Sequence, residues 1–117
     1  MYKIILASLL FASNVYADTF NLAWDATTQD SDGAPLSAPL QNYKLYVSTI
    51  NPVPLTTPFA VIAAPTTTRA VVQNTPGIYF AVVTAVNANG ESKPSNTITF
   101  EVFPKVPKAP ATLRIAP

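Results

Sequence analysis

The sequence has no cysteine and no histidine in its 117 residues. The lack of cysteine excludes disulfides, thiolate nucleophiles and thiolate metal sites. The lack of histidine removes the side chain that most often serves as a general base. Six carboxylates, a few lysines and hydroxyl groups remain as candidate catalytic groups. No hydroxyl group is paired in the sequence with a residue that could act as its base. We therefore expect a protein that is not an enzyme and that needs no cofactor.

Charged residues and glycine are also scarce. Charged side chains make up 11% of the chain and apolar ones 49%, so the chain has enough apolar surface to form a core. Three glycines stand against twelve prolines, which indicates many interrupted segments and little helix. The length fits one domain.

Residues 1–17 have the pattern of a secretory signal peptide. Lys3 precedes an apolar run over residues 4–12, and Val15 and Ala17 suit positions −3 and −1 of a cleavage site. A transmembrane anchor is the alternative, but the run is too short to span hydrocarbon. We expect cleavage after Ala17 and a secreted or periplasmic protein.

The expected mature chain is formally neutral. Seven basic residues less Lys3 leave six, which equals the number of acidic residues. A neutral chain without a basic cluster is not expected to bind nucleic acid or an anionic membrane surface.

The most regular pattern lies in the last third of the chain. Residues 78–86 are almost all apolar, β-branched or aromatic, which is typical of a strand with a buried face. The turn-forming sequence Asn-Ala-Asn-Gly follows at 87–90, and residues 95–103 then alternate between apolar and polar. This pattern predicts a hairpin, which needs a partner sheet to be stable in water.

Four further strands are expected from alternation or from short β-branched runs, at residues 18–25, 42–48, 59–63 and 67–72, the third of them near an edge. Turn-forming residues at 26–40 and three prolines within 49–58 indicate loops between them. No stretch has helical periodicity. The sequence therefore predicts an all-β, antiparallel β-sandwich over residues 18–103 and a proline-rich tail over 104–117.

Several short motifs stand in order between residues 20 and 102. They are Trp24, Asp30-Ser31-Asp32-Gly33 with Pro35-Leu36, Tyr43-Lys44-Leu45-Tyr46, Pro76-Gly77-Ile78-Tyr79, and the series Val83, Ala85, Asn87, Gly90, Ser92, Ser95-Asn96. At these spacings they resemble a fibronectin type III domain of the kind found in bacterial secreted and surface proteins. The resemblance implies an immunoglobulin-like sandwich in which the Tyr79 hydroxyl bonds the backbone of the preceding loop. We expect the core to include Trp24, Tyr43, Leu45, Tyr79, Val83 and Phe100.

The chain departs from the family pattern in two places. Asn74 stands where the family usually has leucine, in the loop that leads to the sixth strand. The family also opens with a strand of the form Pro-x-x-Leu before the tryptophan strand, and cleavage after Ala17 would leave no residues for it. The segment at 107–115 resembles that missing strand.

Three interpretations of the tail remain open. It is a remnant of a tandem array, a disordered proline-rich tail, or a donor strand. As a donor, it would pair with the open edge of residues 18–25 in another chain, and head-to-tail insertion would give filaments. Insertion in the same chain needs residues 104–110 to run back along the whole sandwich. At roughly 3.1 Å per residue, these seven residues are barely long enough to do so. The candidate donor residues are Ala111, Thr112, Leu113, Arg114 and Ile115.

Alternation also predicts an apolar outer face on the central sheet. It places Tyr79, Ala81, Val83 and Ala85 inward, and it leaves Lys44, Tyr46, Phe80, Val82 and Val86 facing outward. Either these five residues form a binding surface for protein or polysaccharide, or the proline loop 49–58 or the tail covers them. The loop tips 26–40 and 87–93 are the other candidate recognition surface.

The charged residues offer little chemistry. Asp30 and Asp32 are the only local carboxylate pair, and they indicate a turn or at most a weak cation site, because the other calcium ligands are absent. Glu91 beside Lys93 indicates a solvated turn. We expect a non-catalytic binding or structural module that contacts protein, with a carbohydrate-binding accessory domain and a self-assembling filament subunit as alternatives.

Overall fold

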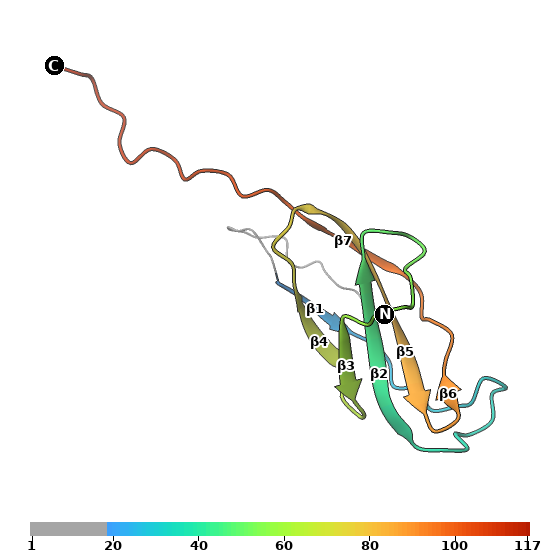
Figure 1. Cartoon of the computed structure of the whole chain (residues 1–117). Helices are drawn as coiled ribbons and strands as arrows, with labels where there is room; N and C mark the ends of the chain where they lie inside the picture. Colours follow the sequence, from blue (N-terminus) through green and yellow to red (C-terminus); the bar gives the residue numbers. More distant parts are fainter. Residues whose placement is uncertain (1–18) are drawn as a thin grey trace.

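The computed structural model describes residues 19–117 and has the all-β architecture expected from the sequence (Figure 1). Within that range it contains no helix, and each strand pairs antiparallel to its neighbours. The expected signal peptide and Asp18 lie outside the described residues. The strands are β1 Thr19–Ala23, β2 Leu40–Ser48, β3 Ala60–Ala63, β4 Thr68–Val72, β5 Gly77–Asn87, β6 Gly90–Glu91 and β7 Ile98–Val102.

The strands form two sheets. Strands β1 and β4 make the smaller sheet, and the larger one has the order β3-β2-β5, with β6 and β7 both paired to β5. All six expected strands are present, and β3 lies at an edge as predicted. The predicted hairpin is also confirmed, since β5 pairs with the chain that follows its turn.

One core joins the two sheets. Leu22 and Val71 come from the smaller sheet, and they pack with Leu45, Tyr79 and Phe100 of the larger one. Tyr43 is buried as well. Four of the expected core residues are therefore confirmed as buried, while Trp24 and Val83 are only partly buried against this core.

Aromatic contacts order the interior around Tyr79. Its ring stacks on Phe100 with centroids 5.6 Å apart, and the Phe20 and Phe100 ring centroids are 4.6 Å apart. The Tyr79 hydroxyl donates a hydrogen bond of 2.6 Å to the carbonyl of Thr75. The predicted bond from Tyr79 to the preceding loop is therefore present.

The last strand begins later than the sequence predicted. Regular pairing starts at Ile98 instead of residue 95, because Ser92 and Ser95 each bond β5 through a backbone N–H and a side-chain Oγ and not through the regular ladder. The Ser95 Oγ accepts a bond of 3.0 Å from the Val83 N–H, while the Ser95 N–H donates to the Val83 carbonyl at 2.9 Å. This segment follows β5 without being a regular strand.

The loop at 30–33 is a turn, as expected. Gly33 adopts φ of 88°, which favours glycine. The Asp30 and Asp32 carboxylates accept hydrogen bonds from the N–H groups of Ser37 and Ala34. The loop is also held to the β5–β6 turn, because the Asn89 amide donates to the Ser37 hydroxyl at 3.1 Å.

Candidate functional site

The outer face of β2 and β5 is covered, which corrects one of the two interpretations of the apolar patch. Tyr46 is 2% exposed and Val82 is 5% exposed, so neither is available as part of a binding surface. Val53 of the proline loop 49–58 is buried with them, and Phe80 packs against this cluster. The alternative is therefore the correct one: the proline loop folds over this face.

The other residues of the expected surface are partly accessible. Lys44, Phe80 and Val86 are intermediate in exposure. They lie on the same face as Tyr46 and Val82, as predicted, because Tyr46 is paired with Val82 and Lys44 with Thr84. The structure thus brings the five residues together on one face. The proline loop covers the part of that face around Tyr46 and Val82, so this part is not an open surface.

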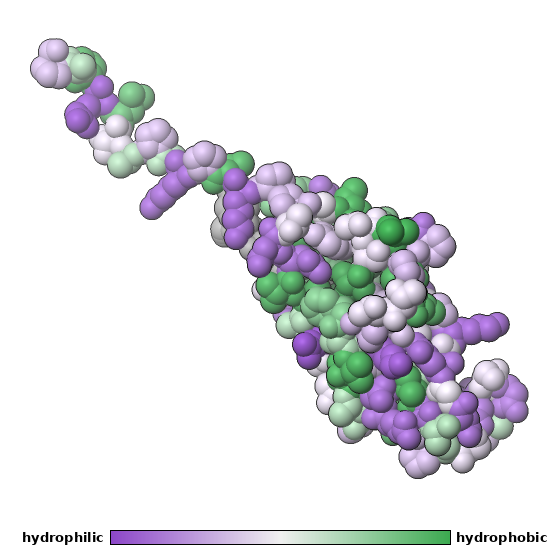
Figure 2. Space-filling view, viewed as in Figure 1, coloured by the Kyte–Doolittle hydropathy of each residue, from purple (hydrophilic) through white to green (hydrophobic). Residues whose placement is uncertain are grey.

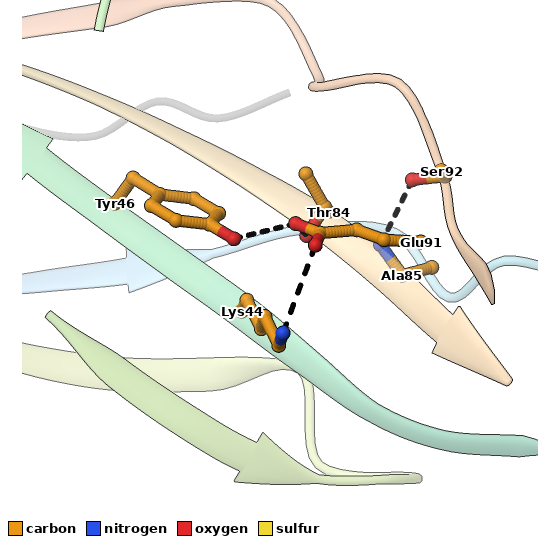
Figure 3. A network of polar contacts seen from close by, with 6 residues as sticks. All are labelled: Lys44, Tyr46, Thr84, Ala85, Glu91 and Ser92. Atoms are coloured by element: carbon orange, nitrogen blue, oxygen red, sulfur yellow. Dashed lines mark hydrogen bonds and ion pairs between the residues drawn. The ribbon is translucent and has the colours of Figure 1, made fainter. Parts of the chain in front are cut away.

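Glu91 occupies the polar end of this face (Figure 3). Its Oε2 accepts a hydrogen bond of 2.5 Å from the Tyr46 hydroxyl and one of 2.7 Å from the Thr84 hydroxyl, while Oε1 lies 3.6 Å from Lys44 Nζ. The turn beside Lys93 is exposed, as expected, but the Glu91 carboxylate bonds Tyr46, Thr84 and Lys44, which was not predicted. The bond between Tyr46 and Glu91 joins residues 45 positions apart, which local sequence could not reveal.

The hydrogen bonds of this cluster change the ionisation of two groups. Hydrogen bonds from Tyr46 and Thr84 lower the pKa of Glu91 from its ordinary value of 4.5. Burial, with the hydrogen bond to Glu91, raises the pKa of Tyr46 to about 12. Glu91 is therefore a charged acceptor and Tyr46 a neutral donor at neutral pH, and their hydrogen bond joins β2 to β6.

Acid should weaken this cluster. Because the folded state lowers the pKa of Glu91, its contribution to stability is present above about pH 4.5 and is lost as the pH falls through the folded value. We expect Glu91→Gln to reduce the loss of unfolding free energy between pH 6 and pH 3, measured by urea denaturation. Glu101→Gln on the exposed face of β7 is the matched control and should keep the wild-type dependence. Equal pH dependence in the two variants would contradict the role of Glu91.

A groove opens along the opposite side of the sandwich, where β1 faces the segment after β6. It has a volume of about 540 Å³ and continues as a smaller hollow of about 50 Å³. Residues 22–25 form one wall, Val83 lies between the walls, and residues 92–96 with Ile98 form the other wall. We call this the β1 groove.

The edge of β1 beside this groove carries unused backbone groups. Within residues 19–117, β1 pairs only with β4. The Trp24 N–H donates to the Thr67 carbonyl at 3.0 Å, so antiparallel alternation directs the backbone groups of Phe20, Leu22 and Trp24 toward β4. The groups of Asn21 and Ala23 then point to the open edge.

The side chains in the β1 groove are incompletely covered. Trp24, Val83 and Ile98 belong to the core but remain partly exposed, and all three line the groove. The Trp24 Nε1 is buried without an acceptor among the described residues. A polypeptide strand laid here would cover these side chains and bring carbonyl oxygens to this wall.

The candidate donor residues lie far from this groove in their own chain. Residues 103–117 are exposed, and Figure 1 shows the tail running away from the sandwich. The structure therefore does not bring residues 111–115 beside β1 of the same chain.

Two other properties of the described residues bear on function. Within residues 19–117, no three His, Cys, Asp or Glu side chains are grouped to hold a metal ion. No helix in that part of the chain is long and apolar enough to cross a membrane. No protein-family model matches the sequence, and no curated protein matches it.

Proposed function

We propose that this protein is a secreted or periplasmic, non-catalytic binding module of the fibronectin type III kind that accepts a strand from a protein partner. The observation that carries the proposal is the unpaired edge of β1 above the β1 groove. An added strand would gain main-chain hydrogen bonds from β1, and the groove would select its alternate side chains.

Three features support the family. The two-stranded sheet packs across one core against the larger sheet, the Tyr79 hydroxyl bonds the preceding loop, and Trp24, the residue after β1, packs against the core. In the family an opening strand precedes the tryptophan strand, and among residues 19–117 no strand pairs with the edge of β1 that faces away from β4. The open edge and the partly covered side chains are what the loss of that strand would leave.

The other sheet edges suit a partner strand less well. Strand β3 has four residues and lies between Pro58 and Pro65. The outer edge of β4 carries the exposed Arg69, and a charge on an edge discourages pairing. The β1 edge, in contrast, borders a groove with partly exposed apolar walls.

A sugar site on the β2–β5 face has no support in this geometry. Tyr46 would have to offer its ring face to a sugar, but the ring is buried with Val53 and Val82. The proposal therefore rests on the β1 groove.

A generic strand peptide tests the proposal. Trp24 is the only tryptophan and lines the groove, so its fluorescence reports occupancy. We expect a soluble peptide of alternating valine and threonine, flanked by lysines, to shift the Trp24 emission to shorter wavelength in a saturable manner, because the strand excludes water from the indole.

The control is the same peptide with alternate amides N-methylated, which keeps the side chains and removes the backbone donors. It should produce at least about tenfold weaker binding. If neither peptide changes the emission at millimolar concentration, or if both act equally, β1 does not accept strands.

A further inference from the structure

We propose that the strand accepted at β1 is residues 111–115 of a second copy of this chain, so that copies join head to tail. This inference rests on the proposed function and names its partner. The occupant follows from the tail's exposure, its alternation, its direction and its fit to β1.

The tail carries apolar side chains that nothing in its own chain covers. Leu113 is 99% exposed and Ile115 is 96% exposed. Ala111, Leu113 and Ile115 alternate with Thr112 and Arg114, so one face of an extended tail is apolar and the other polar. Figure 2 shows the tail standing clear of the domain with apolar residues near its end. This is the pattern of an edge strand that lacks a sheet.

The direction of the tail favours a second copy. Figure 1 shows that the tail leaves the sandwich at the end where β7 finishes and β1 begins, and that it continues outward. The tail of a neighbouring copy that approaches the opposite end, near Asp25, would enter the β1 groove antiparallel to β1. The chain's own tail would first have to run back along the sandwich. Residues 104–110 span only about 22 Å at 3.1 Å per residue, and they would also have to turn twice.

One register places every apolar donor residue on the groove side. Residues directly opposite each other in an antiparallel pair share a face. If Leu113 lies opposite Leu22, then Ala111 lies opposite Trp24 and Ile115 opposite Phe20. The smallest apolar donor side chain, Ala111, then faces Trp24, the large residue that directly follows β1.

The backbone agrees with the same register. Thr112 and Arg114 lie opposite Ala23 and Asn21, the β1 residues whose N–H and C=O groups point to the open edge. Pro110 falls at the mouth of the groove, where the missing N–H removes only a terminal bond. Each copy would have its donor and its acceptor at opposite ends, so the contact does not close and produces chains of copies.

Two variants separate donor from acceptor. Leu113→Asp places a charge where the donor must enter an apolar groove, and it changes a fully exposed residue, so the domain stays folded. Ala23→Pro removes an edge N–H without touching the bonds to β4. Thr112→Asp is the matched control, since it adds the same charge to the outward face of the tail.

The test is analytical ultracentrifugation of the whole chain, expressed with its own leader and purified as the host processes it. Wild type and Thr112→Asp should form concentration-dependent series of oligomers. Leu113→Asp and Ala23→Pro should each weaken self-association about tenfold or more and sediment as monomers. An equimolar mixture of these two variants should form a dimer and stop there, because it contains one functional donor and one functional acceptor.

Other outcomes overturn the inference. It fails if the wild type stays monomeric at millimolar concentration, if Leu113→Asp assembles as the wild type does, or if the mixture stays monomeric, which is the result expected for insertion within one chain. A wild type that stays monomeric but binds the valine–threonine peptide would leave the proposed function standing without this partner.

Discussion

Replacing Tyr46 by alanine is expected to lower the free energy of unfolding by about 3–5 kcal/mol, as for other large aromatic side chains removed from a core. The ring is 2% exposed and packs with Val53 and Val82, so its removal leaves a cavity beneath the proline loop. A domain of this size is stable by about 5–15 kcal/mol, so this loss is a large fraction of the total stability. Urea denaturation followed by circular dichroism measures the change.

Tyr46→Phe divides this effect into two parts. Phenylalanine keeps the ring and loses the hydroxyl bond to Glu91, a loss of about 1–2 kcal/mol, because Glu91 keeps Thr84 and Lys44 as partners. The alanine variant should therefore be the less stable of the two by a clear margin. If Tyr46→Ala unfolds at the same urea concentration as the wild type, the ring is exposed in solution and the face of β2 and β5 is an open surface after all.

The local pattern of the sequence was sufficient to predict the strands. Alternation over 42–48 and the apolar run over 78–86 depend on neighbours in the chain, and both appear as β2 and β5 with ends shifted by one or two residues. The hydrogen bond from Tyr79 to Thr75 was expected for a different reason, because the resemblance to the fibronectin type III family implied it.

The covering of the outer face was harder to predict, because it depends on the path of a loop. Val53 stands between two prolines in a segment that excludes a strand, and only the folded structure shows it packed on Tyr46. The same loop also holds Ile50 and Leu55, which are exposed, so the sequence did not indicate which of its apolar residues would cover the face. Glu91 was misjudged for a similar reason, since its partner Lys44 is brought near by the register of three strands.

The partial exposure of Trp24 has a different cause. The alternation of β1 points this side chain inward, and that direction is confirmed by its contact with Tyr43, whose ring centroid lies 5.5 Å away. Its burial is incomplete because no strand covers the edge beside it within residues 19–117. The difference between the expected and the observed burial therefore locates the candidate site.

An open β1 edge is also a hazard that proteins usually avoid. Unpaired N–H and C=O groups beside exposed apolar side chains are a template for uncontrolled association. In this chain the edge is short and the matching tail carries Thr112 and Arg114 on its other face, so the paired strand would present polar groups to solvent. A defined donor would thus replace uncontrolled association with a single contact.

The most direct test of the open edge is amide hydrogen exchange of Asn21 and Ala23, measured by NMR in the Leu113→Asp chain with and without a peptide of residues 108–117. Without the peptide, these two amides should exchange nearly as fast as in an unstructured chain, while those of Leu22 and Trp24 stay protected by β4. Millimolar peptide should slow Asn21 and Ala23 by about 100-fold or more, because each gains a backbone partner. Protection of Asn21 and Ala23 before the peptide is added, or fast exchange in its presence, would contradict the account.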